Sequence, residues 1–335
     1  MKNLLLTLGH NSSAILIEDG KVKWGYETER LSYKKSDSEF PLRVLEYTGI
    51  KPDMAYVTHW APTGVLSDMS HKHWKPEYLD GVKIVTLSPD MSHHDTHYHA
   101  ALAYAGPKFP THKAIALVID GFGTLGEHLS VYDLTTTKLI ARYHGYHTSL
   151  GLWYQYATAF LGMKMHEDEY KLLGYEVHTT WSEREMLQPK IDACVKKWMQ
   201  ELYTSIYGSK YDPMYDIAAL ANVRDRIFND LTEIAQFMHL SDLQSTQNRA
   251  VIAYYVQAVL EGVVLNIVKS FNPNHVLCSG GVFYNVKLNK RLLDFVPGQL
   301  CVYPLAGDQG NAIGLYAAHN NFTFPDTLNW GVRSL

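Results

Sequence analysis

The stretch SHHDTHYHAAL (residues 92–102) is the starting point for interpreting this sequence, together with LVIDG (residues 117–121). His93 and His97 are four residues apart, and the Ala-rich run that follows favours a helix, on which both imidazoles share one face. The apolar run that ends at Asp120 predicts a strand that presents this carboxylate at its carboxyl end. Two imidazoles and a carboxylate form a ligand set that suits Fe(II), Zn or Mn. The sequence therefore predicts a divalent-metal site.

The histidines of this stretch also allow a plainer interpretation. Four of its residues are histidines, and such side chains can be solvated on the surface or can hydrogen-bond to metal ligands without binding a metal themselves. An HxxxH metalloprotease is excluded, because no glutamate follows the first histidine to serve as the base. We favour the metal site because motifs elsewhere in the chain support it.

The composition limits the class of protein. The chain has 335 residues, 46% of them hydrophobic, which is typical of one large globular domain or two lobes. Three cysteines without a pairing pattern indicate a reducing compartment. We find neither the apolar core of a signal peptide nor an uninterrupted membrane-spanning run, so we expect a cytoplasmic protein without membrane contact. With 30 basic against 34 acidic residues, charge does not support nucleic-acid binding.

The order of the predicted elements indicates two α/β lobes that close on a cleft. Residues 3–33 predict a β-meander, and a similar strand-turn-strand pattern returns after residue 114. Residues 61–90, with His71 and His73, predict an irregular loop or lid. The domains we expect are an N-terminal α/β lobe over 1–148 and a C-terminal α/β lobe over 149–335, with a helical insertion at about 182–240.

Several loops could hold a phosphate against backbone amides. Small donors follow the first strand, glycines interrupt IDGFGTLGE (residues 119–127), and a glycine pair separates a predicted strand from a helix near residue 280. Glycine in such loops is more often simple turn chemistry. The candidate cofactor-binding residues from these loops are Ser12, Ser13, Gly121, Gly123, Gly280 and Gly281.

Eight motifs occur in order along nearly the whole chain: GHNSSAILIEDG, ETERLSYKKSDSEFP, SHHDTH, VIDGFG, SLGLWY, DEYKLLG, SGGVFYNVKLNK and PLAGDQGNAIG. Together they resemble the N-terminal catalytic domain of the ATP-dependent O-carbamoyltransferases of the nodulation-factor and antibiotic-tailoring type. The resemblance implies a two-lobed nucleotide-binding fold of the actin/Hsp70/sugar-kinase class. The chain is also similar to the transferase that installs threonylcarbamoyl on tRNA adenosine.

The resemblance assigns metal ligands and catalytic groups. The ligands would be His93, His97, Asp120 and Asp308, which would hold iron or, as alternatives, zinc or manganese. The spacing beyond His97 is longer than the family's, so His99 stays open as an alternative ligand. His10 matches the family's reactive histidine, and Lys35 matches the lysine that precedes the FP dipeptide. Where the family has a histidine after this lysine, this chain has Ser36.

The resemblance also implies the nucleotide contacts and the reaction. The nucleotide would contact Glu169 and Lys171 of the EYK motif, and Gly280, Gly281 and Asn285. The reaction would move a carbamoyl group from carbamoyl-adenylate, made from carbamoyl phosphate and ATP, to a hydroxyl. His10 would serve as general base or orient the acceptor, since an imidazole ionises near neutrality. Lys35 would neutralise phosphate or carbamoyl-oxygen charge, and the metal would act as Lewis acid.

Fused family members continue into a YrdC-type domain that makes the carbamoyl-adenylate, whereas this chain stops at Leu335. The resemblance therefore leaves two alternatives: a separate YrdC-type protein supplies the intermediate as a partner, or this chain works differently. The acceptor would be a sugar or polyketide hydroxyl, or a hydroxymethylated pyrimidine, free or in nucleic acid.

Two further functions remain open. A threonylcarbamoyl-type tRNA transferase would share fold and metal, although the HHDTH sequence and the lack of a basic face disfavour it. A non-catalytic nucleotide-binding or metal-binding partner subunit is the alternative that is not an enzyme.

Overall fold

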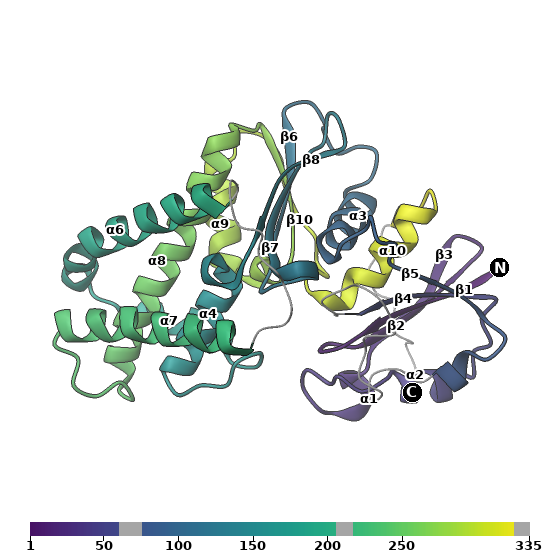
Figure 1. Cartoon of the computed structure of the whole chain (residues 1–335), viewed down its shortest axis with the longest axis horizontal. Helices are drawn as coiled ribbons and strands as arrows, with labels where there is room; N and C mark the ends of the chain where they lie inside the picture. The colour runs from purple at the N-terminus through teal and green to yellow at the C-terminus, as the bar shows by residue number, and fades with distance from the viewer. Residues whose placement is uncertain (60–75, 206–216, 325–335) are drawn as a thin grey trace.

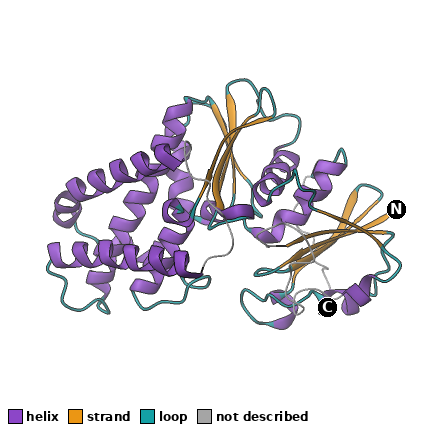
Figure 2. Ribbon diagram, viewed as in Figure 1, coloured by secondary structure: helices purple, strands orange, loops and turns teal. Residues whose placement is uncertain are grey.

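The strands of the protein form two sheets with a pair of helices between them (Figure 1). The structure is a computed structural model that describes residues 1–59, 76–205 and 217–324. Within these ranges each sheet has five strands, and most of the remaining helices gather beside the second sheet (Figure 2).

The first sheet has the order β3-β2-β1-β4-β5. β1 is antiparallel to β2 and parallel to β4, while β3 and β5 extend the sheet on either side. β1 is buried from its second residue onward, because an apolar strand in the middle of a sheet has layers on both faces. The bounds are β1 Lys2–Leu8, β2 Ser13–Glu18, β3 Lys21–Glu27, β4 Met54–His59 and β5 Lys83–Thr86.

The second sheet repeats this arrangement with the order β10-β9-β6-β7-β8. Its central strand β6 is antiparallel to β7 and parallel to β9, as β1 is to β2 and β4. The bounds are β6 Ala114–Ile119, β7 Glu127–Asp133, β8 Lys138–His144, β9 His275–Ser279 and β10 Leu300–Val302. Two α/β lobes with the same strand order are the arrangement that the family resemblance implied, so the predicted fold class is confirmed.

The helices α3 (His93–Ala105) and α10 (Asn311–His319) lie against one another between the sheets (Figure 1). α3 packs mainly on β6 and β9 of the second sheet, whereas α10 packs on β1 and β4 of the first. The two helices cross closely, since a Cβ added at Gly314 would lie 1.8 Å from the carbonyl oxygen of Thr96. Only glycine permits this approach.

The other helices divide between the lobes. α1 (Glu29–Ser32) and α2 (Leu42–Thr48) belong to the first lobe, and a short 3-10 helix spans Pro76–Leu79. α8 is the core helix of the second lobe, and it is apolar enough to span a membrane, but 67% of the relevant window is buried inside the protein. The second-lobe bounds are α4 Leu150–Phe160, α5 Glu169–Tyr175, α6 Trp181–Ser205, α7 Ile217–Phe237, α8 Thr246–Phe271 and α9 Val286–Phe295.

The lobes divide earlier in the chain than the predicted boundary at residue 148. β6, β7 and β8 lie before that boundary but pair with β9 and β10 in the second sheet. The last helix, α10, returns to the first lobe. Strand pairing between segments far apart in sequence has no signature in the order of elements, which is why the boundary was misplaced.

The predicted helical insertion at 182–240 corresponds to α6 and α7, with residues 206–216 outside the described part. The stretch 61–90, expected to be irregular, contains β5, whose four residues are too few for a clear strand pattern. His71 and His73 lie outside the described residues.

Candidate active site

The first turn of α3 is fixed on several sides, and this places two imidazoles. Ser92 is the N-cap: its hydroxyl accepts from the Asp95 amide, and the Asp95 carboxylate accepts from the Ser92 amide, a reciprocal capping box. The next two amides are satisfied from outside the helix, by Thr124 and by the buried Glu127. His93 and His97 therefore project from a helix start that has little freedom to move.

Two aspartates complete the group from other elements. Asp120 follows β6, and its Oδ1 accepts from the amides of Gly121 (2.8 Å) and Gly281 (3.3 Å), which leaves Oδ2 for the imidazoles. Asp308 is buried in the loop before α10. Its Oδ1 lies 3.2 Å from His93 Nε2 and 3.4 Å from His97 Nε2.

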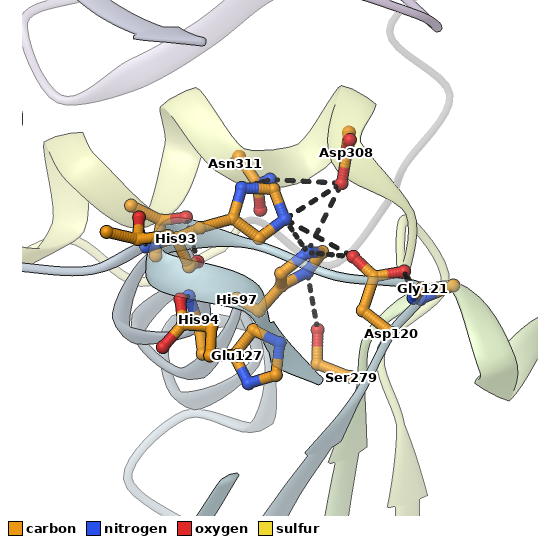
Figure 3. A network of polar contacts seen from close by, with 12 residues as sticks. His93, His94, His97, Asp120, Gly121, Glu127, Ser279, Asp308 and Asn311 are labelled. Atoms are coloured by element: carbon orange, nitrogen blue, oxygen red, sulfur yellow. Dashed lines mark hydrogen bonds and ion pairs between the residues drawn. The ribbon is translucent and has the colours of Figure 1, made fainter. Parts of the chain in front are cut away.

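Figure 3 shows these four side chains pointing toward one common centre. The Nε2 atoms of His93 and His97 are 3.2 Å apart, and Asp120 Oδ2 lies 3.2 and 3.4 Å from them. One ligand atom from each residue lies within 4.8 Å of all the others. The sequence predicted that His93, His97 and Asp120 come together, and the resemblance added Asp308.

The donor set fits a divalent metal ion. Ligand atoms at 2.0–2.1 Å from a tetrahedral ion are roughly 3.3 Å from one another, close to the separations found here. The other ring nitrogens face polar groups: His97 Nδ1 lies 3.4 Å from the Ser279 hydroxyl, and His93 Nδ1 lies 3.4 Å from the Asn311 amide. Such outer contacts orient histidine ligands so that the opposite nitrogen faces the ion.

In the cluster, the imidazoles of His93 and His97 lie close to the carboxylates of Asp120 and Asp308, and each group affects the pKa of the others. Burial disfavours the protonated form of His93, but the carboxylates of Asp308 and Asp120 outweigh it and raise its pKa well above the ordinary value. Burial also disfavours the protonated form of His97, but hydrogen bonds with Asp120 and Asp308 raise its pKa. Burial and Asp308 disfavour ionised Asp120, yet hydrogen bonds from the two histidines hold its pKa below the usual range. The site therefore binds positive charge, as protons or as a cation.

A second polar layer supports α3 from the side of β7 and β8. Arg142 donates to the Asp95 carboxylate (2.6 Å) and forms an ion pair with the fully buried Glu127 (3.2 Å). Tyr132 also donates to Asp95. Because both carboxylates also accept from amides at the start of α3, this network couples the sheet to the helix that carries the two histidines.

A cavity of about 320 Å³ lies beside the cluster, and Asp120 and Asp308 form part of its wall. His10 lines the cavity from the loop after β1, with its Nε2 3.5 Å from Asp308 Oδ2. Lys35 lines it as well; its ammonium group donates to the Glu167 carbonyl and lies 5.0 Å from the centre of the Tyr170 ring. The cleft thus brings groups from both lobes together.

The candidate residues of the sequence divide into two sets. Besides the two aspartates, the cavity is lined by these predicted residues: His10, Lys35, Gly121, Glu169, Gly281 and Asn285. Burial raises the pKa of the Glu169 carboxyl. The predicted cofactor-binding residues that do not line it are Ser12, Ser13, Gly123, Lys171 and Gly280.

The second set has supporting positions instead. The Ser12 hydroxyl donates to the Glu39 carbonyl and lies 2.6 Å from the Thr28 hydroxyl, and that of Ser13 donates to the Gln309 carbonyl. Lys171 forms an exposed ion pair with Asp168 at 2.8 Å.

The two glycines of this set permit close packing. A Cβ added at Gly123 would lie 2.7 Å from the His93 ring, and one at Gly280 would lie 2.2 Å from the Ile119 carbonyl oxygen. The possible ligand His99 is also on α3, but it is outside the four-residue cluster.

The sequence analysis missed several residues that line the cavity. His166 stands three residues before Glu169 of the EYK motif, close enough to have been noticed. Other missed residues come from α4, α5 and the 3-10 helix before α9, where no sequence pattern distinguishes a cavity-facing side chain from a core one; they include Tyr154, Gln155, Tyr170, Leu173, Val282 and Tyr284.

Fold and site together define an α/β protein whose two like lobes enclose a cavity with a histidine–aspartate cluster in its wall. A family model described as "Carbamoyltransferase N-terminus" matches residues 65–318. The chain belongs to this carbamoyltransferase N-terminus family, so the suspected family is confirmed.

Individual proteins are more distantly similar. The chain is 24% identical over 313 residues to protein MJ1051 of Methanocaldococcus jannaschii, covering 91% of this chain and 55% of that protein. It is 25% identical over 338 residues to the nodulation protein NolNO of Sinorhizobium fredii, covering 92% of this chain and 46% of that protein. The chain thus spans about half the length of these relatives. Component A of the (R)-2-hydroxyglutaryl-CoA dehydratase of Acidaminococcus fermentans aligns with a TM-score of 0.48 at 13% identity, covering 95% of this chain and 99% of that one.

Proposed function

We propose that this chain transfers a carbamoyl group from carbamoyl-adenylate to a hydroxyl of a small molecule or a modified nucleotide. The observation that supports this proposal is the position of the cluster: two of its four members, Asp120 and Asp308, form part of the wall of the cavity in a chain of the carbamoyltransferase N-terminus family. A cavity of about 320 Å³ is also in the size range of small-molecule sites.

His10 is the candidate general base. Its Nε2 faces Asp308 Oδ2 at 3.5 Å, an arrangement in which Nε2 carries the proton and Nδ1 keeps a lone pair. The acceptor hydroxyl would give its proton to Nδ1 while its oxygen forms a bond to the carbamoyl carbon. The bond from that carbon to the phosphate oxygen then breaks, and AMP leaves with the electron pair. A carboxylate that orients an imidazole is a recurrent device in acyl transfer.

Lys35 is the candidate group for the negative charge of the phosphate. Its contacts with the Glu167 carbonyl and the Tyr170 ring hold the ammonium group at the wall of the cavity. Glu169, Gly121, Gly281 and Asn285 line the same space and would surround the adenylate. A fixed cation beside a leaving phosphate favours the departure of AMP.

The four-residue cluster is the proposed site of a divalent ion, with iron as first choice and zinc or manganese as alternatives. When bound, the ion would supply Lewis-acid polarisation of a carbonyl or phosphoryl oxygen. The protein's own contribution is the fixed geometry of His93, His97, Asp120 and Asp308, which the helix cap and the outer polar layer maintain.

We further propose that a YrdC-type activity supplies carbamoyl-adenylate from carbamoyl phosphate and ATP, and that the reaction takes place in the cytoplasm. The three cysteines, Cys194, Cys278 and Cys301, are free thiols, which suits a reducing compartment.

The experiment combines metal analysis with an acceptor screen. The purified chain is incubated with carbamoyl phosphate, ATP and a YrdC-type protein, and hydroxyl acceptors that include sugars, hydroxymethylated nucleotides and tRNA are followed by mass spectrometry. We expect one acceptor to gain the mass of a carbamoyl group, with His93→Ala and His97→Ala losing bound metal and product together. A variant that keeps full metal occupancy would refute the ligand assignment, and a threonylcarbamoyl product on tRNA would replace the proposed reaction.

A further inference from the structure

His166 lies in the loop between α4 and α5 and has an unusual backbone. Its φ is +64°, in the left-handed region that non-glycine residues seldom occupy. Two hydrogen bonds hold it there: its amide donates to Glu169 Oε1 at 2.6 Å, and its carbonyl accepts from the Ser36 hydroxyl at 3.0 Å. Ser36 belongs to the first lobe and Glu169 to the second. A strained backbone that is fixed from both sides of a cleft is typical of a residue with a functional side chain.

The imidazole of His166 lines the cavity next to that of His10. The ring centres are 5.6 Å apart, and the planes are inclined by 54°. The Gln155 amide donates to His166 Nδ1 at 3.4 Å. A neutral imidazole that accepts at Nδ1 carries its proton on Nε2, so this ring presents an N–H donor.

Two further observations describe this donor. Within residues 1–59, 76–205 and 217–324, no protein group is hydrogen-bonded to His166 Nε2, so the donor is available to a ligand. Burial lowers the pKa of His166, and a charge on His10 lowers it further. Both effects favour the neutral ring, against the carboxylates of Asp308 and Asp120, which raise the pKa.

We propose that His166 is a catalytic residue whose Nε2–H donates to the carbonyl oxygen of the carbamoyl group. This inference rests on the proposed function. It identifies the residue beside the general base that contacts the carbamoyl group of the activated substrate. The other nearby groups have different tasks: His10 takes the proton, and Lys35 is a cation suited to the phosphate. His166 is a neutral donor beside His10, and such a donor suits the uncharged carbonyl oxygen of the carbamoyl group.

The donor acts in the step in which charge develops. When the acceptor oxygen bonds to the carbamoyl carbon, the carbonyl π electrons move onto oxygen, and the hydroxyl proton passes to His10. The His166 N–H stabilises that oxyanion more strongly than the ground-state carbonyl. When the C=O bond reforms, the bond to the phosphate oxygen breaks, AMP takes the electron pair, and His166 keeps its proton throughout.

The test compares two ligands that differ in the carbamoyl group. The probes are AMP and a stable carbamoyl-adenylate analogue in which an N-acylsulfamate replaces the mixed anhydride; binding is measured by calorimetry. His166→Gly removes the ring and tolerates the positive φ, so the loop is expected to fold. We expect about a tenfold weaker affinity for the analogue and an unchanged affinity for AMP, since one hydrogen bond is lost. Added imidazole is expected to restore part of the loss.

The matched variants decide between the outcomes. His166→Asn keeps an N–H donor and suits the left-handed backbone, so it should retain more analogue affinity than His166→Gly. His178→Phe, at an exposed histidine that does not line the cavity, should change neither affinity. Equal losses for analogue and AMP, or no loss at all, would overturn the role of His166 while leaving the proposed function intact. If the wild-type chain binds neither probe, the proposed function fails and this inference fails with it.

A second readout observes the ring itself, with its resonance assigned by its loss in His166→Gly. In nitrogen-15 NMR spectra of histidine-labelled protein, neutral His166 should show the tautomer protonated at Nε2, and this resonance should shift when the analogue binds but not when AMP binds. An Nδ1-protonated ring would overturn the proposal.

Discussion

The two parts of the candidate site differ in how they are built. In the cluster, His93, His97 and Asp308 are buried and Asp120 is partly buried, and hydrogen bonds tie the group to a helix cap, loop amides and an outer polar layer. The rim of the cavity, with His10 and Lys35, is partly exposed, and the His10 side chain is 48% accessible. In the proposed function the cluster would hold the cation and the more accessible rim would contact the substrate, so binding of the ion would be separate from exchange of the substrate. The expected effects of mutation therefore differ between them.

The largest effect is expected where the two parts meet. Asp308 contacts both imidazoles of the cluster through Oδ1 and His10 through Oδ2. Asp308→Asn should lower both metal affinity and turnover by more than about a hundredfold, since it removes a charged ligand and the partner of the proposed base. Metal analysis and the carbamoyl-transfer assay measure the two losses. Asp294→Asn, at an exposed carboxylate on α9, should change neither.

The next effect concerns packing behind the cluster. A Cβ at Gly123 would lie 2.7 Å from the His93 ring, so Gly123→Ala should cost about 1–3 kcal/mol of unfolding free energy and weaken metal binding. Gly174→Ala is the matched control, because a Cβ there meets nothing within 4 Å and alanine favours the helix. Denaturant unfolding and metal titration give the two values. Equal stability of the two variants would mean that His93 shifts without cost.

Metal affinity should rise with pH, because protons on His93 and His97 compete with the metal ion. The carboxylates raise the pKa of both histidines in the metal-free protein, against the effect of burial, so protons compete with the metal. Affinity should rise with pH through this range, by up to about tenfold per pH unit for each proton displaced. Calorimetry in buffers of different ionisation enthalpy counts the protons released. Binding without proton release would contradict this description of the cluster.

The smallest effects belong to the rim. Lys35→Ala should weaken binding of AMP by about tenfold, since a cation at the cavity wall is lost. Lys171→Ala, at the lysine of the EYK motif that pairs with Asp168 and does not line the cavity, should change it by less than about twofold. Fluorescence or calorimetric titration with AMP separates the two. Equal losses would place both lysines at the nucleotide.

The sequence predicted the buried cluster better than the rim, for a physical reason. The i,i+4 spacing of His93 and His97 is a local property of a helix, and the strand before Asp120 is a clear apolar run. Asp308 comes from the far end of the chain, and only the family resemblance indicated it. Cavity-facing residues such as Gln155 and Tyr154 lie on a helix whose pattern does not reveal which side chains reach the ligand.

Glycines and serines were the weakest part of the prediction. Gly123 and Gly280 were assigned to phosphate loops, yet both are glycine because a side chain would collide with His93 or with the backbone of Ile119. Ser12 and Ser13 hold neighbouring loops together. A small residue before a helix or in a hairpin indicates a close approach of some group, and sequence alone does not distinguish protein from ligand.

The crossing of α3 and α10 places the proposed ion site between the two lobes. His93, His97 and Asp120 belong to the second lobe, whereas Asp308 leads into the helix that packs on the first. A cation held by these ligands would therefore connect the two lobes, close to the point where α3 and α10 meet at Thr96 and Gly314. Release of the ion would remove that link between the lobes, whereas exchange of a ligand in the cavity would leave it in place.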